Sequence, residues 1–325
     1  MWLNFSRTRR WQRAFGAAYS FMNNSAPEPG RLRLILGVGR SGTSWVSQVL
    51  FKTTMRCRCF LEPLFHIAPP LPIHKKGDHT AVGYEELSPG HPLICAWQLL
   101  AHRKFGGPGM ATLERDDADW EICLVKEVHA LLGMEALLRL WQTPAVFILR
   151  DPVYVIDSLF AAQTLQTIYL DHEVEAVRQH AFLERFAPGR QTAVERLFAD
   201  AARREPRQRI ILGKALCVQM LQEMFSVLAA EFPCAKALRY DQLCAAPRES
   251  FQSLAGALAI PWDNAMDSYL AKTTEADATS SDPYSIMRNT ADQNDRPFRF
   301  LSPAEVALCR EAMQTIRGDS GARGH

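Results

Sequence analysis

A glycine-framed loop between an apolar run and a helical segment constrains the fold of this chain more than any other feature. The apolar run 32–36 predicts a buried strand, residues 37–42 predict a tight turn, and a helix is expected to begin at Thr43. Gly37 and Gly42 match the first and last glycines of the phosphate-binding pattern G-x-x-x-x-G-K-[ST], but Thr43 stands where ATP and GTP enzymes have lysine. The loop therefore predicts an anion site and argues against a nucleoside triphosphate.

The side chains of this loop suit a compact tetrahedral anion. The hydroxyls of Ser41, Thr43 and Ser44 and the guanidinium of Arg40 accompany the start of the predicted helix, where backbone N–H groups are free to bind an anion. An ordinary strand-to-helix turn is the alternative interpretation of this segment taken alone.

A second arginine follows a second buried strand. The apolar run 146–149 ends at Arg150, Asp151 is a natural N-cap, and Pro152 suits the first position of a helix that contains Ser158. Arg150 is therefore expected at the carboxyl edge of a sheet. Two anion sites on neighbouring strand ends predict a ligand that carries phosphate groups at two places.

With these two motifs the chain resembles the sulfotransferases that use 3′-phosphoadenylyl sulfate (PAPS), in particular the bacterial and carbohydrate-type enzymes. The 5′-phosphosulfate loop of that family is similar to residues 40–45, and its 3′-phosphate motif pairs an arginine and a serine eight residues apart, as Arg150 and Ser158 are here. Residues 239–243 resemble its R-Y-E/D-x-L element. The resemblance implies that the donor is bound by Arg40, Ser41, Gly42, Thr43, Ser44, Trp45, Arg150, Ser158, Tyr240 and Arg288.

Two of these residues belong to more distant motifs. Tyr240 matches the tyrosine that lies beside the adenine in the family. Arg288 matches the arginine of a C-terminal R-K-G loop that closes over the 3′-phosphate, but Asn289 and Thr290 replace the lysine and the glycine, so one positive charge is missing.

The resemblance also implies three catalytic residues. Glu62 lies in an E-P-L element after the predicted strand 57–61 and is expected to be the base; burial among apolar neighbours is expected to raise its pKa, and a salt bridge with an arginine is the alternative. Arg40 is expected to stabilise the bridging oxygen as the S–O bond breaks, and Lys126 to contact the sulfonate. His129 lies one residue beyond the catalytic histidine position of phenol sulfotransferases, so that role is not expected for it.

Short apolar segments alternate with helical ones along the chain. Strands are expected at 32–37, 57–61, 121–126, 144–150 and 235–240, and helices at 43–52, 130–141, 152–165 and 248–259. This alternation predicts an α/β fold, a P-loop-type parallel sheet flanked by helices, with a helical acceptor-side elaboration over residues 166–232. One sulfotransferase domain, residues 31–325, is expected to follow an N-terminal arm and linker, residues 1–30.

Composition and charge indicate a cytoplasmic protein without a nucleic-acid partner. The net charge is only +2, with 37 basic and 35 acidic residues interspersed. The eight cysteines lie mostly in apolar segments, which predicts reduced, buried thiols. Residues 1–22 combine aromatic side chains with arginines, so an arm in solution and a peripheral helix on an anionic membrane surface are alternatives.

The expected reaction is transfer of the sulfuryl group from PAPS to a hydroxyl or amine, with release of adenosine 3′,5′-bisphosphate and no required metal ion. The E-P-L element favours a glycan, glycolipid or lipid-linked hydroxyl as acceptor. A phenol or alcohol sulfotransferase and a non-catalytic PAPS-binding protein are the alternatives. A P-loop kinase is disfavoured by Thr43 and Arg150, which occupy the places of its lysine and its acidic magnesium ligand.

Overall fold

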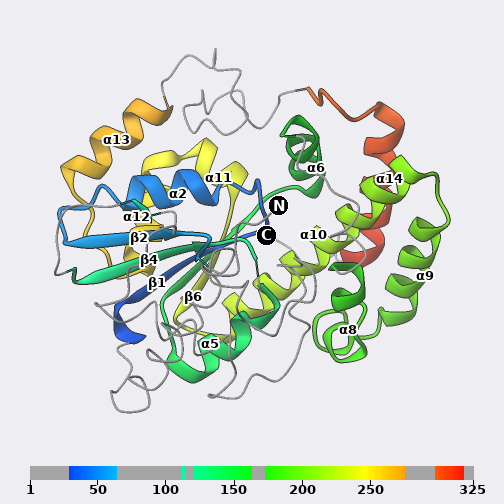
Figure 1. The fold of residues 1–325 in the computed structure, drawn as a ribbon, viewed down its shortest axis with the longest axis horizontal. Coiled ribbons are helices and arrows are strands. Elements are labelled where there is room, and N and C mark those ends of the chain that lie inside the picture. Colours follow the sequence, from blue (N-terminus) through cyan, green and yellow to red (C-terminus); the bar gives the residue numbers. More distant parts are fainter. Residues whose placement is uncertain are drawn as a thin grey trace, which may run out of the picture.

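The computed structural model describes residues 29–63, 112–113, 120–129, 131–162, 173–274 and 297–317. These residues build a sheet with helices on both faces (Figure 1). The strands lie in the order β3 (Thr112–Leu113), β2 (Cys57–Leu61), β4 (Ile122–Glu127), β1 (Leu32–Leu36), β5 (Ala145–Leu149) and β6 (Ala235–Arg239). The last five are parallel, whereas the two-residue β3 pairs with β2 in the antiparallel direction at the edge.

The central strands are covered on both faces because their sequences are almost continuously apolar. All six residues of β4 are buried, including Lys126 and Glu127 at its carboxyl end. Side chains alternate between the two faces of each strand, so Leu34 and Phe147 join one hydrophobic cluster whereas Ile35 joins the other.

Two sets of helices cover these faces, and a third lies beside the sheet (Figure 1). Ile35 shares its hydrophobic cluster with residues of α2 (Thr43–Leu50), α11 (Tyr240–Ala245), α12 (Pro247–Ala257) and α13 (Asn264–Thr274). The opposite face packs against α5 (Met134–Trp141) and α10 (Pro206–Glu231). The helices beside the sheet are α6 (Pro152–Ala161), α8 (His180–Phe186), α9 (Gln191–Ala202) and α14 (Pro303–Arg317).

Helix α10 is the one helix of the described residues that is long and apolar enough to cross a membrane by length and composition. Its most apolar stretch is 67% buried inside the fold, and it packs against β6, α6, α9 and α14. Phe225 of this helix stacks on Phe147 of β5, with ring centroids 4.7 Å apart. Burial on several sides explains the apolar sequence of α10, which is a core helix of this fold.

The α/β class, the parallel sheet and the flanking helices expected from the sequence are confirmed. The strand expected at 57–61 has those limits, but β6 ends at Arg239 because Tyr240 already begins α11, a helix that was not expected. The edge strand β3 was also not among the expected strands.

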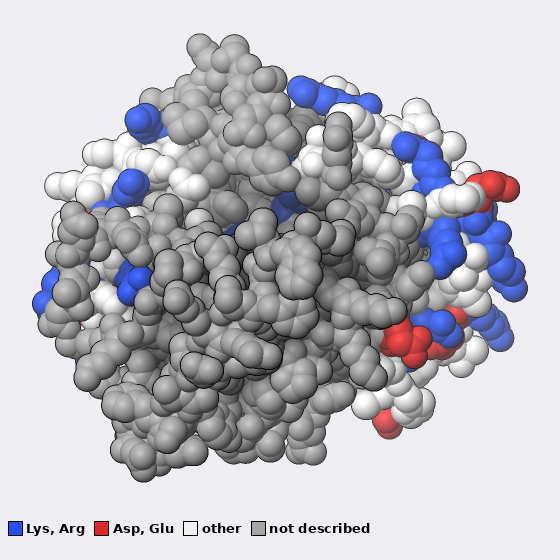
Figure 2. All heavy atoms as spheres, viewed as in Figure 1, with Lys and Arg blue, Asp and Glu red and all other residues white. Residues whose placement is uncertain are grey.

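The cysteines and the surface charges of the described residues are arranged much as the composition predicted. The seven cysteines in the described part of the chain are not disulfide-bonded, and all of them except Cys234 are buried. Figure 2 shows basic and acidic side chains close together over the helical side of the viewed face, in keeping with 37 basic and 35 acidic residues in the sequence.

Candidate functional site

The order of the strands marks one edge of the sheet as the place for a ligand. From β1 the chain crosses to β2 on one side, whereas from β5 it continues to β6 on the other. Because β1 and β5 are neighbours, their connections leave in opposite directions, and α/β sheets typically form the ligand crevice at such a point, beyond the carboxyl ends of the two strands. The segments that follow these strands contain the two predicted anion motifs.

The segment after β1, residues 37–42, is here called the glycine loop, and its first and last positions have no room for a side chain. A Cβ on Gly37 would lie 2.5 Å from Ser41 Oγ and 2.9 Å from the backbone oxygen of Ile148. Gly42 has a φ of +102°, and a Cβ there would lie 2.5 Å from the Tyr240 ring. Glycine is therefore required at both ends of the loop for this close packing.

Arg40, Arg150 and Ser158, here called the arginine cluster, meet at the crevice. Arg40 Nε donates a hydrogen bond of 3.0 Å to Ser158 Oγ, a residue 118 positions away in the sequence. Arg150 Nη1 donates to the backbone oxygen of Arg40 at 2.8 Å. The two anion motifs inferred separately from the sequence are thus joined by direct contacts.

Arg150 is held firmly in this cluster. Only 8% of the residue is exposed, and its guanidinium carbon lies 4.3 Å from the centroid of the Tyr240 ring. The side chain of Gln222 on α10 donates to the backbone oxygen of Arg150. The position of this cation is therefore set by the sheet, by α10 and by the first residue of α11.

The two aromatic residues that the resemblance assigns to the donor lie beneath the glycine loop. Trp45 and Tyr240 are both buried and meet edge to face, with ring centroids 6.1 Å apart. The indole N–H of Trp45 donates to Thr273 Oγ1 at 3.0 Å. These contacts support the loop from the face covered by α2, and the predicted contacts of both residues with the donor stay predictions.

The three hydroxyl residues of the loop and helix start differ in their surroundings. Ser44 is exposed, whereas Thr43 and Ser41 are buried. Ser41 Oγ has no hydrogen-bond partner among the described residues. A buried hydroxyl without a partner is costly, so a bound anion or water that accepts from Ser41 would stabilise the loop.

A second group, here called the carboxylate cluster, consists of Glu62, Lys126 and His129. Glu62 follows β2 in a left-handed conformation (φ +52°), and its backbone N–H donates to the Lys126 oxygen at 2.7 Å. The ammonium of Lys126 forms a hydrogen-bonded ion pair with Glu62 Oε1, and His129 Nε2 lies 3.5 Å from Oε2. Both oxygens of the carboxylate are therefore engaged.

The pKa of Glu62 moves in the opposite direction from the one expected. Burial alone would raise it, but the hydrogen bond with His129 and the positive charge of Lys126 outweigh burial and lower the pKa to about 2. The expectation of a raised pKa was wrong because it considered only the apolar neighbours. The alternative, a salt bridge of Glu62 with an arginine, was closer to the observed arrangement, in which the cation is Lys126.

Glu127 was missed by the sequence interpretation. Its carboxylate is buried, and its Oε1 accepts the backbone N–H groups of Val128 and His129 at 2.9 and 2.8 Å. This contact fixes the turn that brings His129 back to Glu62. A glutamate at a strand end, two residues before a histidine, was the signal that could have identified the turn.

Lys126 of the carboxylate cluster lies on β4, the strand that pairs with β1 just before the glycine loop. Lys126 pairs in register with Ile35, two residues before Gly37. Ile35 and Leu124 belong to the hydrophobic cluster that contains α2, and Lys126 follows Leu124 by two positions on the same strand. By strand alternation Lys126 faces the same side of the sheet as the helix that follows the glycine loop.

Two further expectations concern metal ligation and Arg288. Within the ranges that the structure describes, no group of three or more His, Cys, Asp or Glu side chains is arranged to hold a metal ion. Arg288 and the residues after Pro63 in the E-P-L element lie outside the described residues.

Comparisons with known proteins gave no match: neither the models of known protein families nor the curated proteins contain a significant relative of this chain.

Proposed function

We propose that this protein is a PAPS-dependent sulfotransferase of the P-loop type, which transfers a sulfuryl group to a hydroxyl or amine and releases adenosine 3′,5′-bisphosphate. The observation that carries the proposal is the arginine cluster, in which Arg40 contacts Ser158 and Arg150 contacts Arg40 at the crevice between β1 and β5. A donor with phosphate groups on both its 5′ and 3′ sides would be bound by both motifs at once.

The proposed reaction assigns one role to each charged group. The acceptor oxygen bonds to sulfur while the bond between sulfur and the bridging oxygen breaks, and the electron pair of that bond leaves on the 5′-phosphate. Arg40 neutralises the charge that develops on this leaving group, and Lys126 binds the sulfonate oxygens. The acceptor proton passes to the carboxylate of Glu62, which lies at the end of the neighbouring strand β2.

The acceptor is proposed from the E-P-L element alone. Glu62 and Pro63 begin this element, which in the resembled enzymes faces carbohydrate acceptors, and a glycan, glycolipid or lipid-linked hydroxyl is therefore the proposed substrate class. A phenol or alcohol acceptor would be handled by the same donor site, and a panel of acceptors in the assay distinguishes the two classes.

The test separates donor binding from turnover with two variants. Calorimetry with adenosine 3′,5′-bisphosphate should show tight binding in EDTA and much weaker binding of magnesium–ATP. Arg150→Ala should cost about 2–4 kcal/mol of bisphosphate affinity, because a partner of a charge-assisted hydrogen bond is lost at an enclosed site. Glu62→Gln should leave that affinity nearly unchanged while lowering PAPS turnover by roughly 10²–10⁴-fold.

Arg204→Ala is the matched control for the arginine variant. Arg204 forms an exposed ion pair with Asp200 beyond the end of α9, so its removal should change neither binding nor turnover. Magnesium–ATP bound as tightly as the bisphosphate would contradict the proposal. Tight PAPS binding without turnover of any acceptor would favour the non-catalytic alternative.

A further inference from the structure

The carboxylate cluster presents a conflict within the proposed mechanism. A general base works best when its pKa is close to the working pH, yet Lys126 and His129 hold the pKa of Glu62 at about 2. The same Lys126 that binds the sulfonate in the proposed reaction is paired with Glu62 in this structure. In the arrangement described here Glu62 is therefore a weak base, and its Oε1 is occupied by Lys126.

We propose that Lys126 changes partner when the sulfuryl donor binds, so that its ammonium leaves Glu62 for the sulfonate and frees one carboxylate oxygen for the acceptor proton. This inference rests on the proposed function. It deepens that function by making Lys126 the link between donor binding and the base.

The position of Lys126 supports this exchange. Its side chain is only 6% exposed, so water cannot replace a lost anionic partner and the ammonium must stay paired with one anion or another. Glu62, with 34% of its side chain exposed, is the better solvated partner and can lose the ion pair at lower cost. The ammonium is a compact charge on a flexible four-carbon stem, which suits movement between two neighbouring anions.

The strand register places Lys126 beside the start of the glycine loop. Lys126 pairs with Ile35, and the glycine loop begins two residues further along the neighbouring strand. Lys126 also faces the side of the sheet on which α2 starts, by its alternation with Leu124. A sulfonate bound at the start of α2 would therefore lie on the side toward which the lysine side chain already points.

The other groups around Glu62 stay in place and determine how far its pKa rises when Lys126 leaves. His129 remains beside Oε2, anchored by the contact between its backbone N–H and Glu127. Cys59, on β2, also responds to the charge of Lys126, but burial raises the pKa of this thiol well above its usual value and keeps it neutral. Departure of Lys126 thus removes the lysine contribution that lowers the pKa of Glu62 and leaves the histidine contribution.

The exchange can be tested by following the titration of Glu62 directly. Carbon-13 NMR of labelled glutamate carboxyls, assigned with Glu62→Gln, reports the pKa of Glu62 in the free protein, with adenosine 3′,5′-bisphosphate and with PAPS without acceptor. PAPS should raise that pKa by about one unit or more, whereas the bisphosphate, which lacks the sulfonate, should raise it much less. Lys126→Met should show a raised pKa before any ligand is added and a much smaller further increase with PAPS.

Two further variants make the result decisive. Lys52→Met removes a lysine whose ammonium lies over the Tyr269 ring, 4.6 Å from its centroid, and should leave the PAPS-induced shift intact. Lys126→Gln replaces Lys126→Met if the methionine variant does not fold. An equal PAPS-induced shift in the wild type and in the Lys126 variant would overturn the exchange, because repulsion by the donor would then explain it.

Calorimetry on the same samples distinguishes failure of the partner exchange from failure of the proposed function. Bound PAPS with no change in the titration of Glu62 overturns the exchange and leaves the proposed function standing. Absence of PAPS binding overturns the proposed function, and the exchange with it.

Discussion

At the scale of single residues, Arg40 and Glu62 of the candidate site both have a strained backbone conformation with a positive φ. Apart from Arg40 and Glu62, only Gln142 and Ala259 among the described non-glycine residues have a positive φ. Such conformations cost on the order of 1 kcal/mol or more and persist where surrounding contacts enforce them. Arg40 and Glu62 are both held by hydrogen bonds at the carboxyl edge of the sheet, which is the edge proposed for chemistry.

Gly42 and Gly39 of the glycine loop offer a matched test of this packing. Gly42→Ala should lower the free energy of unfolding by about 1–3 kcal/mol, because its φ is +102° and the new Cβ would meet the Tyr240 ring at 2.5 Å. Gly39→Ala should change it by less than about 1 kcal/mol, since nothing lies within 4 Å of a Cβ at that position. Urea unfolding of both variants measures the difference, and equal losses would contradict the role assigned to Gly42.

The sequence predicted the members of the arginine cluster but not the partners of Glu62. Arg40, Arg150 and Ser158 were found because each belongs to a local pattern of strand, turn and helix start. The contact of Glu62 with His129 depends on a left-handed residue and on a turn held by Glu127. No local pattern encodes a pairing between the ends of two strands that are 64 residues apart.

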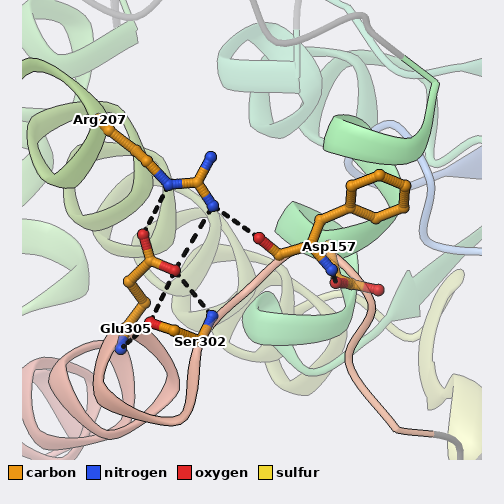
Figure 3. A network of polar contacts seen from close by, with 5 residues as sticks. Asp157, Arg207, Ser302 and Glu305 are labelled. Atoms are coloured by element: carbon orange, nitrogen blue, oxygen red, sulfur yellow. Dashed lines mark hydrogen bonds and ion pairs between the residues drawn. The ribbon is translucent and has the colours of Figure 1, made fainter.

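At the scale of elements, a polar network ties α6, α10 and α14 together beside the proposed site (Figure 3). Asp157, the neighbour of Ser158 on α6, accepts the backbone N–H groups of Arg299 and Phe300 at 3.0 and 2.8 Å. Arg207 of α10 donates to the Phe300 oxygen at 2.6 Å and to Glu305 of α14 at 2.7 Å. The segment that leads into α14 is thus fixed against the helix that carries Ser158.

Part of this network was readable from the sequence. Ser302 and Glu305 have the spacing of a capping box, and the structure shows Glu305 accepting from the backbone N–H and the hydroxyl of Ser302. The partner Arg207 lies 98 residues before Glu305, and only the packing of α10 on α14 brings the two together. Local chemistry predicts a helix start, whereas the contacts between helices follow from the whole fold.

Asp157 should contribute more to stability than an exposed aspartate. Asp157→Ala should lower the free energy of unfolding by about 1–3 kcal/mol, because two backbone N–H groups lose a buried carboxylate acceptor. Asp200→Ala, which removes one partner of an exposed ion pair with Arg204, should cost less than about 0.5 kcal/mol. Urea unfolding compares the two variants. A loss for Asp157→Ala no larger than that of the control would show that the contacts of Asp157 with the segment before α14 do not stabilise the fold.

At the scale of the whole molecule, the sequence predicted a parallel sheet but not the order of its strands. The apolar runs and intervening helices identify the elements, because a strand buried on both faces must be apolar throughout. The central position of β1 and the edge position of β3 depend on which strands pair with one another over long sequence distances. The neighbouring positions of β1 and β5 were expected from the two anion motifs, whereas the positions of the other strands in the sheet are known only from the folded chain.

Acid should destabilise the molecule in a window set by its paired carboxylates. The ordinary pKa of a glutamate is 4.5, and that of Glu62 is lowered to about 2 by His129 and Lys126 against the opposing effect of burial. The hydrogen bond from Arg207 likewise lowers the pKa of Glu305, and hydrogen bonds with Thr54 and Met266 outweigh burial to lower that of Asp263. A lowered folded-state pKa stabilises the protein above the unfolded-state value and loses that contribution as pH falls toward the folded-state value.

The free energy of unfolding should therefore be nearly constant from pH 7 to about 5 and fall as pH decreases from about 5 toward 2. Urea unfolding at a series of pH values measures this decline. Glu62→Gln should make the decline shallower. Between about pH 5 and 2 the unfolded wild type binds a proton at Glu62 and the folded wild type does not, and this difference is absent in the variant. Glu249→Gln, which removes an exposed carboxylate in the first turn of α12, is the control. Equal slopes for the wild type and Glu62→Gln below pH 5 would mean that Lys126 and His129 do not hold Glu62 ionised in the folded protein, and the partner exchange proposed for Lys126 would lose its premise.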